Sequence, residues 1–227
     1  MISILQSPTP DKIKGEEFYL NLGFKKVSND PLIVTDGKAF IEINADRFAR
    51  AGIKLFKNNW ESEINKLQDI TAITAFKNGH LLSDPSGVWI YLMEIPAPVL
   101  PDFENQSFSN LGNYAGLSLE TTDIQRSINL YQTLGFTISG GSLDQGYLSL
   151  DYNGFTISLM KPLSCPHLFF NPSLTYFNGK DNLAVIQKIR HLNIPITEEI
   201  THFNKDGIVD NIIIRDPGGF GFFIFSD

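Results

Sequence analysis

The chain carries one set of sequence features twice, and this repetition limits its fold more than any other property. Three anchors recur 112 positions apart: Asp11 and Asp123, Phe18-Tyr19 and Leu130-Tyr131, Leu22-Gly23-Phe24 and Leu134-Gly135-Phe136. A closing phrase, DPSGVWIYL at 84–92, recurs 132 positions later as DPGGFGFFI at 216–224. Matched anchors in the same order indicate a duplicated domain, with about 20 extra residues in the loops of the second copy.

The two copies divide the chain into two domains and a linker. The segment PAPVLPDFENQSFSNLGN at 96–113 is rich in Pro, Asn and Ser, a composition typical of linkers. The sequence therefore predicts a first domain at 1–95, a linker at 96–113 and a second domain at 114–227. A chain of 227 residues is long enough for two domains of ordinary size.

Hydrophobic patterning predicts the same elements in each copy. In the second copy, 116–122 alternates as a strand, Asp123 is a suitable N-cap for a helix, and Gly135 marks the helix end. Two strands around a Tyr-Asn-Gly turn (146–160), a strand (173–177), a helix (181–192) and two strands around the Asp-Pro-Gly-Gly turn follow. Each copy thus contains a strand-helix-strands unit twice, which makes four units in all.

Composition excludes several classes of function. The net charge is −7 and no basic patch stands out, so we expect no nucleic-acid partner. The chain has no apolar run of 18 residues and no signal-peptide pattern at its start, so we expect no membrane partner. A single cysteine, Cys165, rules out an internal disulfide framework and suits a reducing cytoplasm. We therefore expect a cytoplasmic protein.

The motifs of the repeat resemble a known superfamily. A strand, then Asp-x-x-x-Ser-x-x-x-Tyr, Leu-Gly-Phe and a closing Asp-Pro-x-Gly are similar to the vicinal oxygen chelate superfamily, which includes glyoxalase I, bleomycin-resistance proteins and extradiol dioxygenases. The resemblance covers nearly the whole chain and is closer in the second domain. It implies an α/β (α+β) fold in which tandem βαβββ units form curved mixed sheets, each shaped as a cup.

The resemblance also implies where metal ligands would lie. Enzymes of the superfamily hold a divalent metal in the cup with His and Glu side chains, leaving open positions for substrate oxygens. In this chain the positions that correspond to those ligands carry other residue types. They are Ile4, Ile53 and Tyr91 in the first domain, and Gly116, Leu174 and Phe223 in the second.

Only Glu42 falls near a ligand position, and its counterpart in the second domain is Ser158. One carboxylate supplies too few ligands to retain a catalytic metal, and the spacings of the four histidines match no metal template. The sequence therefore predicts no metal and no cofactor in either cup. No catalytic residues can be named from it.

Aromatic residues at the ligand positions predict an apolar cup wall. Side chains alternate along a strand, so residues 89, 91 and 93 share one face, as do 221, 223 and 225. We expect the concave side to carry Trp89, Tyr91, Met93, Phe223 and Phe225, joined by Glu42, Leu55, Ser118, Glu120 and Tyr176. The residues predicted to bind a ligand are Trp89, Tyr91, Phe223, Glu42, Glu120 and Tyr176.

Three functions fit these features. The first is a metal-independent small-molecule-binding protein of the glyoxalase/bleomycin-resistance type, whose partner is a small-molecule ligand. The second is a metal-dependent lyase, isomerase or dioxygenase of the same superfamily, against which the missing ligands count. The third is a non-catalytic structural or partner-binding module whose cups are filled by their own aromatic rings. The sequence leaves open whether the chain forms a homodimer.

Overall fold

The computed structural model describes residues 2–104 and 106–226 and contains two eight-stranded sheets. The strand order is β2-β3-β4-β1-β5-β8-β7-β6 in the first sheet and β10-β11-β12-β9-β13-β16-β15-β14 in the second. The two orders are identical when eight is added to each number. The sheets therefore fit two tandem copies of one domain, and the α/β fold with curved mixed sheets is confirmed.

The first sheet and its helices come from residues before the linker. Their bounds are β1 Ile2–Pro8, α1 Lys12–Asn21, β2 Lys25–Asn29, β3 Leu32–Thr35, β4 Phe40–Asn44, β5 Gly52–Phe56, α2 Glu61–Leu67, β6 Ile73–Phe76, β7 Gly79–Ser83 and β8 Trp89–Met93. Strand β1 pairs in parallel with β4, and β5 pairs in parallel with β8. The antiparallel pairing of β1 with β5 joins the two units into one sheet.

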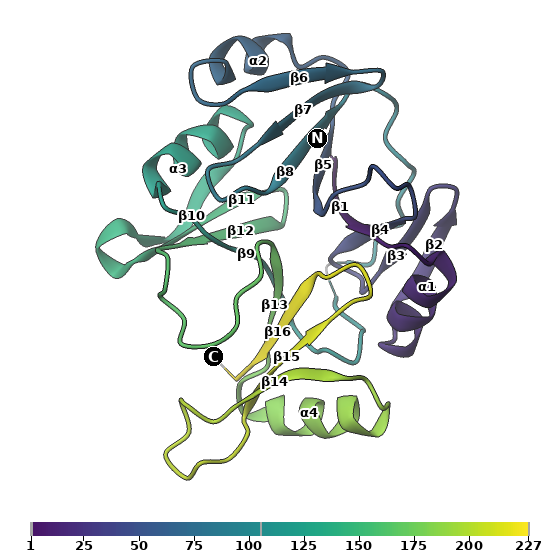
Figure 1. Ribbon diagram of the computed structural model, residues 1–227, viewed down its shortest axis with the longest axis vertical. Helices are drawn as coiled ribbons and strands as arrows, with labels where there is room; N and C mark the ends of the chain where they lie inside the picture. The colour runs from purple at the N-terminus through teal and green to yellow at the C-terminus, as the bar shows by residue number, and fades with distance from the viewer. Residues whose placement is uncertain (1, 105, 227) are drawn as a thin grey trace.

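The second sheet repeats this plan. Its elements are β9 Tyr114–Glu120, α3 Ile124–Thr133, β10 Thr137–Ser142, β11 Tyr147–Tyr152, β12 Phe155–Met160, β13 Ser173–Phe177, α4 Asn182–His191, β14 Ile196–Ile200, β15 Asn211–Arg215 and β16 Gly221–Phe225. Figure 1 shows the four strand-helix-strand units following one another around the molecule.

The repeated Asp and Gly residues begin and end the first helix of each domain, as predicted. The Asp11 carboxylate accepts from the backbone N–H groups of Ile13 and Lys14, each at 3.1 Å. Asp123 accepts in the same way from the N–H of Arg126 at 2.9 Å. Gly23 and Gly135 follow the helices with φ of 85° and 101°, a conformation that glycine adopts without strain.

Sequence patterning missed three edge strands, β2, β6 and β10. Most of their residues are partly or fully exposed, so they lack the alternation that reveals a half-buried strand. Gly140 and Gly141 lie within β10, where an irregularity in register separates Ile138 from Gly140.

One large hydrophobic cluster, here called the main core, extends through both domains. It contains the helix-facing side chains of both sheets, such as Leu5, Ile90, Leu117 and Ile224, together with Tyr19 and Tyr131 from helices α1 and α3. Two smaller clusters lie on the concave faces of the sheets. The domains are therefore joined through their helix-facing sides, and the cups lie apart from this junction.

The Asp of each closing phrase binds the other domain. Tyr131 donates its hydroxyl hydrogen to Asp84 Oδ2 at 2.7 Å, and Tyr19 donates to Asp216 Oδ2 at 2.9 Å. Ser7 also donates to Asp216 Oδ2. Burial raises the pKa of Asp84 and of Asp216, while these hydrogen bonds oppose the shift. This reciprocal pair of contacts is the structural reason why the phrase and the helix tyrosine occur together in each copy.

Within its own turn, each of these aspartates accepts backbone N–H groups through Oδ1. The N–H of Val88 lies 2.9 Å from Asp84 Oδ1, and the N–H of Phe220 lies 2.6 Å from Asp216 Oδ1. One carboxylate thus closes a turn with one oxygen and joins the domains with the other. Across the described residues, no helix is long and apolar enough to cross a membrane.

Candidate functional site

The centre of each cup is formed by two adjacent antiparallel strands. In the first domain Ile4 of β1 lies opposite Lys54 of β5, and Lys54 pairs with Tyr91 of β8. Gln6 of β1 pairs with Glu42 of β4. Lys54, Tyr91 and Glu42 thus meet on the concave face.

Two residues expected in the first cup lie on the other side of the sheet. Ile53, assigned to a ligand position, and Leu55, expected beside Glu42, both belong to the main core. The strand position that faces the cup is Lys54. A shift of one residue along a strand moves a side chain to the opposite face, so the expected register was wrong by one.

The same one-residue error affects the second domain. Leu174 and Tyr176 belong to the main core, and Thr175 between them faces the cup. Tyr176 is fully buried and donates its hydroxyl hydrogen to Asp36 Oδ2 at 2.9 Å. Burial raises the pKa of Tyr176 well above its usual range. Tyr176 is therefore part of the junction between the domains and does not line the cup.

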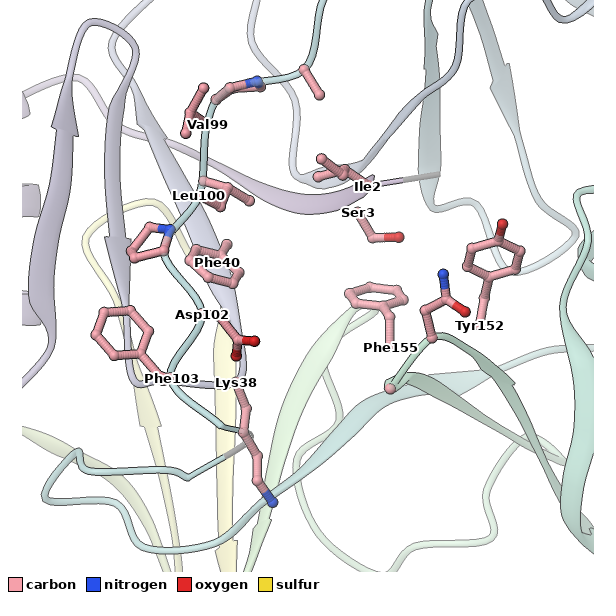
Figure 2. A pocket seen from close by; sticks show the side chains of 16 residues that line it. Ile2, Ser3, Lys38, Phe40, Val99, Leu100, Asp102, Phe103, Tyr152 and Phe155 are labelled. Carbon is pink, nitrogen blue, oxygen red and sulfur yellow. The ribbon is translucent and has the colours of Figure 1, made fainter.

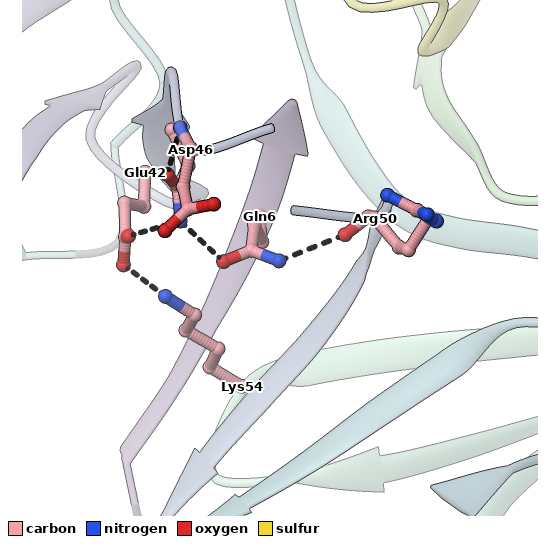
Figure 3. A network of polar contacts seen from close by, with 6 residues as sticks. Gln6, Glu42, Asp46, Arg50 and Lys54 are labelled. Atoms are coloured by element: carbon pink, nitrogen blue, oxygen red, sulfur yellow. Dashed lines mark hydrogen bonds and ion pairs between the residues drawn. The ribbon is translucent and has the colours of Figure 1, made fainter. Parts of the chain in front are cut away.

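A polar network crosses the floor of the first cup (Figure 3). Lys54 Nζ lies 2.7 Å from Glu42 Oε2, and both side chains are about nine-tenths buried, at 11% and 10% exposure. Asn44 Nδ2 donates to Glu42 Oε1 at 3.2 Å and to Gln6 Oε1 at 2.9 Å. Gln6 Nε2 donates to the carbonyl of Arg50 at 2.8 Å. Glu42 is therefore one half of a buried ion pair.

The two predicted aromatic residues of β8 have different surroundings. Tyr91 is half-buried, and its ring packs with Ile4, Phe56 and Met93 in the concave cluster. Burial raises the pKa of Tyr91. Trp89, at the start of the strand, remains 37% exposed.

A pocket of about 570 Å³ lies over the Glu42–Lys54 pair. It is lined by Val27, Ser28, Asp30, Pro31, Glu42, Lys54, Phe56, Asn78, Met93, Ile95, Pro96, Pro98 and Val99. Neither Trp89 nor Tyr91 is among these lining residues, although both stand on the same face of the sheet.

The second cup holds a row of hydroxyl groups, here called the hydroxyl row: Ser149, Ser158, Ser118 and Thr175. These residues come from four adjacent strands, β11, β12, β9 and β13. Ser118 Oγ and Thr175 Oγ1 are 2.7 Å apart, and the Oγ atoms of Ser149 and Ser158 are 2.9 Å apart. A hollow of about 350 Å³ lies above the row, lined also by Ala115, Gly116, Tyr147, Met160 and Phe177.

This hollow exists because small residues replace large ones. Ser118 pairs with Ser158 as Gln6 pairs with Glu42 in the first domain. Ser149 pairs with Ser158 as Ile33 pairs with Glu42, and Gly116 lies opposite Thr175 as Ile4 lies opposite Lys54. At equivalent positions the first cup therefore carries Ile, Gln and Glu, and the second cup carries Gly and Ser.

Aromatic rings fill the other half of the second cup. Phe223 and Phe225 face the cup as predicted and stack at 5.5 Å between ring centroids. The loop after β12 places His167 5.3 Å and Phe169 5.0 Å from the Phe223 ring. Phe223 is consequently only 3% exposed.

Glu120, the remaining predicted binding residue of the second cup, is the last residue of β9. Its backbone N–H and carbonyl are bound by the side chain of Asn171, at 2.9 and 2.8 Å. It is half-buried and is not among the residues that line the hollow above the hydroxyl row.

The donor set of neither cup fits a divalent metal. In the part of the chain that the structure describes, no group of three His, Cys, Asp or Glu side chains is placed to hold one. The central positions carry Ile4, Lys54 and Tyr91 in one cup, and Gly116, Thr175 and Phe223 in the other. Glu42, the one carboxylate at a central position, has its oxygens bonded to an ammonium and an amide.

A third hollow, a cleft of about 560 Å³, lies where the first domain, the linker and the turn between β11 and β12 meet (Figure 2). Phe40 and Leu100 lie on one side of it and Phe155 on the other. Its charged side chains, Lys38 and Asp102, are exposed, so they would fix the orientation of a ligand only weakly.

The sequence matches no protein-family model and no curated protein. Solved structures share its fold. A variant of homoprotocatechuate 2,3-dioxygenase from B. fuscum has a TM-score of 0.57 at 13% identity, over 99% of this chain and 70% of that one. The Mn(II)-bound glyoxalase from Novosphingobium aromaticivorans has a TM-score of 0.56 at 14% identity, over 97% and 79%.

A third solved structure, 2,2',3-trihydroxybiphenyl 1,2-dioxygenase from Sphingomonas wittichii, has a TM-score of 0.53 at 13% identity, over 99% of this chain and 91% of that one. Identities of this size establish the fold alone. The chain has the fold of the vicinal oxygen chelate superfamily, as the sequence motifs predicted, and its two similar eight-stranded sheets fit tandem domains.

Sequence reasoning missed Lys54, Thr175 and Ser149 as cup residues. Lys54 offered a signal, because it is the one charged residue in the apolar strand sequence GIKLF. A lysine in a central strand is expected to reach a polar cavity or a counter-ion. Thr175 and Ser149 offered none, because hydroxyl residues occur on both faces of strands.

Proposed function

We propose that this protein is a metal-independent small-molecule-binding protein whose principal site is the hollow above the hydroxyl row of the second cup. The observation that carries this proposal is the exchange of large side chains for Gly116, Ser118, Ser149 and Ser158 at the centre of the cup. A sheet face that served packing alone would be filled, because empty space in a protein interior costs stability.

The lining of the hollow favours an uncharged ligand. None of the described residues that line it carries a charge at neutral pH. A charged ligand would lose its hydration and find no counter-ion, whereas hydroxyl groups can both donate to and accept from a neutral polar group. Tyr147 and Phe177, 45% and 44% exposed, stand at the rim and offer rings to a flat molecule.

The size of the hollow, about 350 Å³, is at the lower end of the range for small-molecule sites. A molecule of one or two rings with a hydroxyl or amide group would fit it. A metal-dependent reaction at this site is less well supported, because Gly116, Thr175 and Phe223 offer at most one hydroxyl as a donor.

The test compares three probes that share a ring and differ in charge: benzyl alcohol, benzoate and benzylammonium. We expect benzyl alcohol to raise the melting temperature and to bind saturably in an NMR titration, and the two ions to bind at least about tenfold more weakly. The double variant Ser118→Val/Ser158→Val should lose the binding. Ser62→Val on the exposed face of α2 is the matched control and should retain it.

Two results would overturn the proposal. Equal binding of all three probes would show that the hydroxyl row does not select the ligand. Absence of binding by any of them to the wild-type protein would favour a purely structural role for the cup.

A further inference from the structure

The ammonium group of Lys54 is nearly buried and has spare hydrogen-bonding capacity. It carries three N–H donors, and Glu42 Oε2 is its one acceptor among the residues that the structure describes. A buried donor without a partner costs free energy, so the remaining N–H groups require oxygen atoms from outside the chain. Lys54 is one of the residues that line the pocket of about 570 Å³.

Lys54 lies at the centre of the first cup. Lys54 lies opposite Ile4 and beside Tyr91, at the point where the strands bring the central positions of the cup together. Its Nζ is 6.0 Å from the centroid of the Tyr91 ring. A positive charge that belongs to the chain itself therefore stands where the resemblance implies that metal-containing relatives hold a cation.

The surrounding network fixes this charge in place. Glu42 holds the ammonium through Oε2, and Asn44 holds Glu42 through Oε1. Asn44 is in turn bound to Gln6, which is tied to the backbone at Arg50. Polar groups oriented before a ligand arrives lower the cost of ordering them during binding.

The pocket limits what can reach the ammonium. Its walls include Val27, Phe56, Met93 and Pro96, which suit an apolar body. Glu42 already balances the charge of Lys54, and Asp30 at the pocket adds a negative charge. An anionic ligand would therefore meet an excess of negative charge, whereas a neutral oxygen acceptor would not.

We propose that Lys54 is the resident cation of the first cup and binds the carbonyl oxygen of an uncharged, largely apolar molecule, such as a ketone or an amide. This is a second binding site, distinct in chemistry from the hydroxyl row of the second cup. It depends on hydrogen-bond donation by the ammonium and not on metal coordination.

The experiment uses acetophenone, with ethylbenzene as the probe of similar shape that lacks the oxygen and benzoate as the anionic probe. Affinities are measured by NMR titration of the full-length protein. We expect acetophenone to bind at least about tenfold more tightly than ethylbenzene, because hydrogen bonds to charged groups are among the stronger ones. The 13Cε resonance of Lys54 should move with acetophenone and remain still with ethylbenzene.

The double variant Lys54→Met/Glu42→Gln removes both charges together and leaves no unpaired carboxylate. In it we expect the preference for acetophenone to disappear, while ethylbenzene binds as before. The second-cup variant Ser118→Val/Ser158→Val should keep the shift that acetophenone causes in the Lys54 resonance. A loss of that shift in this variant would overturn the assignment.

Two further results would also overturn it. The first is that acetophenone and ethylbenzene bind the wild-type protein with equal affinity and the Lys54 resonance does not shift. Water would then be the acceptor of the remaining hydrogen bonds of the ammonium. Tighter binding of benzoate than of acetophenone would show that the site selects anions. The Lys54 resonance decides the question even if the double variant fails to fold.

Discussion

At the scale of single residues, Asp84 and Asp216 each make structural contacts both within their own turn and with the other domain. Each is almost fully buried, and each binds its own turn and a tyrosine of the other domain. Burying a carboxylate costs free energy of hydration unless hydrogen bonds within the protein take the place of those to water. Burial outweighs the hydrogen bonds here, because the pKa of each carboxyl is raised.

The raised pKa values predict how stability depends on pH. In the unfolded chain the pKa of an aspartate is about 3.9. The contribution of Asp84 and Asp216 to stability is therefore complete below about pH 4, and it is lost as the pH rises through their raised pKa values in the folded protein. Asp84→Asn and Asp216→Asn remove this titration. The stability of the wild type relative to each variant should therefore fall as the pH increases above about 4. Urea unfolding at several pH values measures this difference, and a difference that grows with pH would contradict the prediction.

The tyrosines that bind these carboxylates can be tested separately. We expect Tyr131→Phe to lower the free energy of unfolding by about 1–3 kcal/mol, because Tyr131 is the one hydrogen-bond donor to the buried Asp84 Oδ2 among the described residues. Tyr19→Phe should lower it by less, because Ser7 still donates to Asp216 Oδ2. Tyr147→Phe, at a ring 45% exposed, is the control and should change it by less than about 0.5 kcal/mol. Similar losses in all three variants would argue against a special role for the contacts between domains.

At the scale of elements, much of the secondary structure could be predicted from sequence and the cup register could not. Central strands such as β9 and β13, and helix α3, have strong patterns, a capping Asp123 and a terminating Gly135. Edge strands are solvated, so β2, β6 and β10 had no pattern to detect.

The cup-facing side of β5 and β13 could not be read from their sequences. Nearly every residue of these strands is buried, so neither strand shows the alternation of buried and exposed residues that would mark one face. As a result Ile53 was expected where Lys54 stands, and Leu174 where Thr175 stands. Glu42 and Tyr91, by contrast, lie on the concave face as expected, because their positions were taken from the motifs that resemble the superfamily and not from the pattern of the strand.

The arrangement of β4, β5 and β8 allows a metal site to be introduced by substitution. Lys54→His combined with Tyr91→Glu would place an imidazole and a carboxylate beside Glu42, a set of three ligands with open positions. We expect this double variant to bind one Co²⁺, seen as visible absorbance in a titration, and to lose it when Glu42→Ala is added. The wild-type protein should show no such band. One Co²⁺ bound by the wild type and lost on Glu42→Ala would contradict our assignment of Lys54.

At the scale of the whole molecule, the continuous main core predicts cooperative unfolding. Both tryptophans, Trp60 and Trp89, lie in the first domain, so their fluorescence reports that domain alone. Circular dichroism in the far ultraviolet reports both. Because the domains share one hydrophobic cluster and the reciprocal Tyr–Asp contacts, we expect the two signals to change at the same denaturant concentration. Separate midpoints would show that the domains unfold independently.

The separation of the cups from the main core has a consequence for how such a chain can diversify. Among the residues that the structure describes, the clusters on the concave faces share no buried residue with the main core. An exchange such as Gln6 for Ser118 at equivalent positions therefore alters one ligand surface and leaves the joint between the halves intact. Substitutions can therefore change the ligand specificity of one cup while the other cup keeps its own. The two cups of this protein already differ in their lining residues.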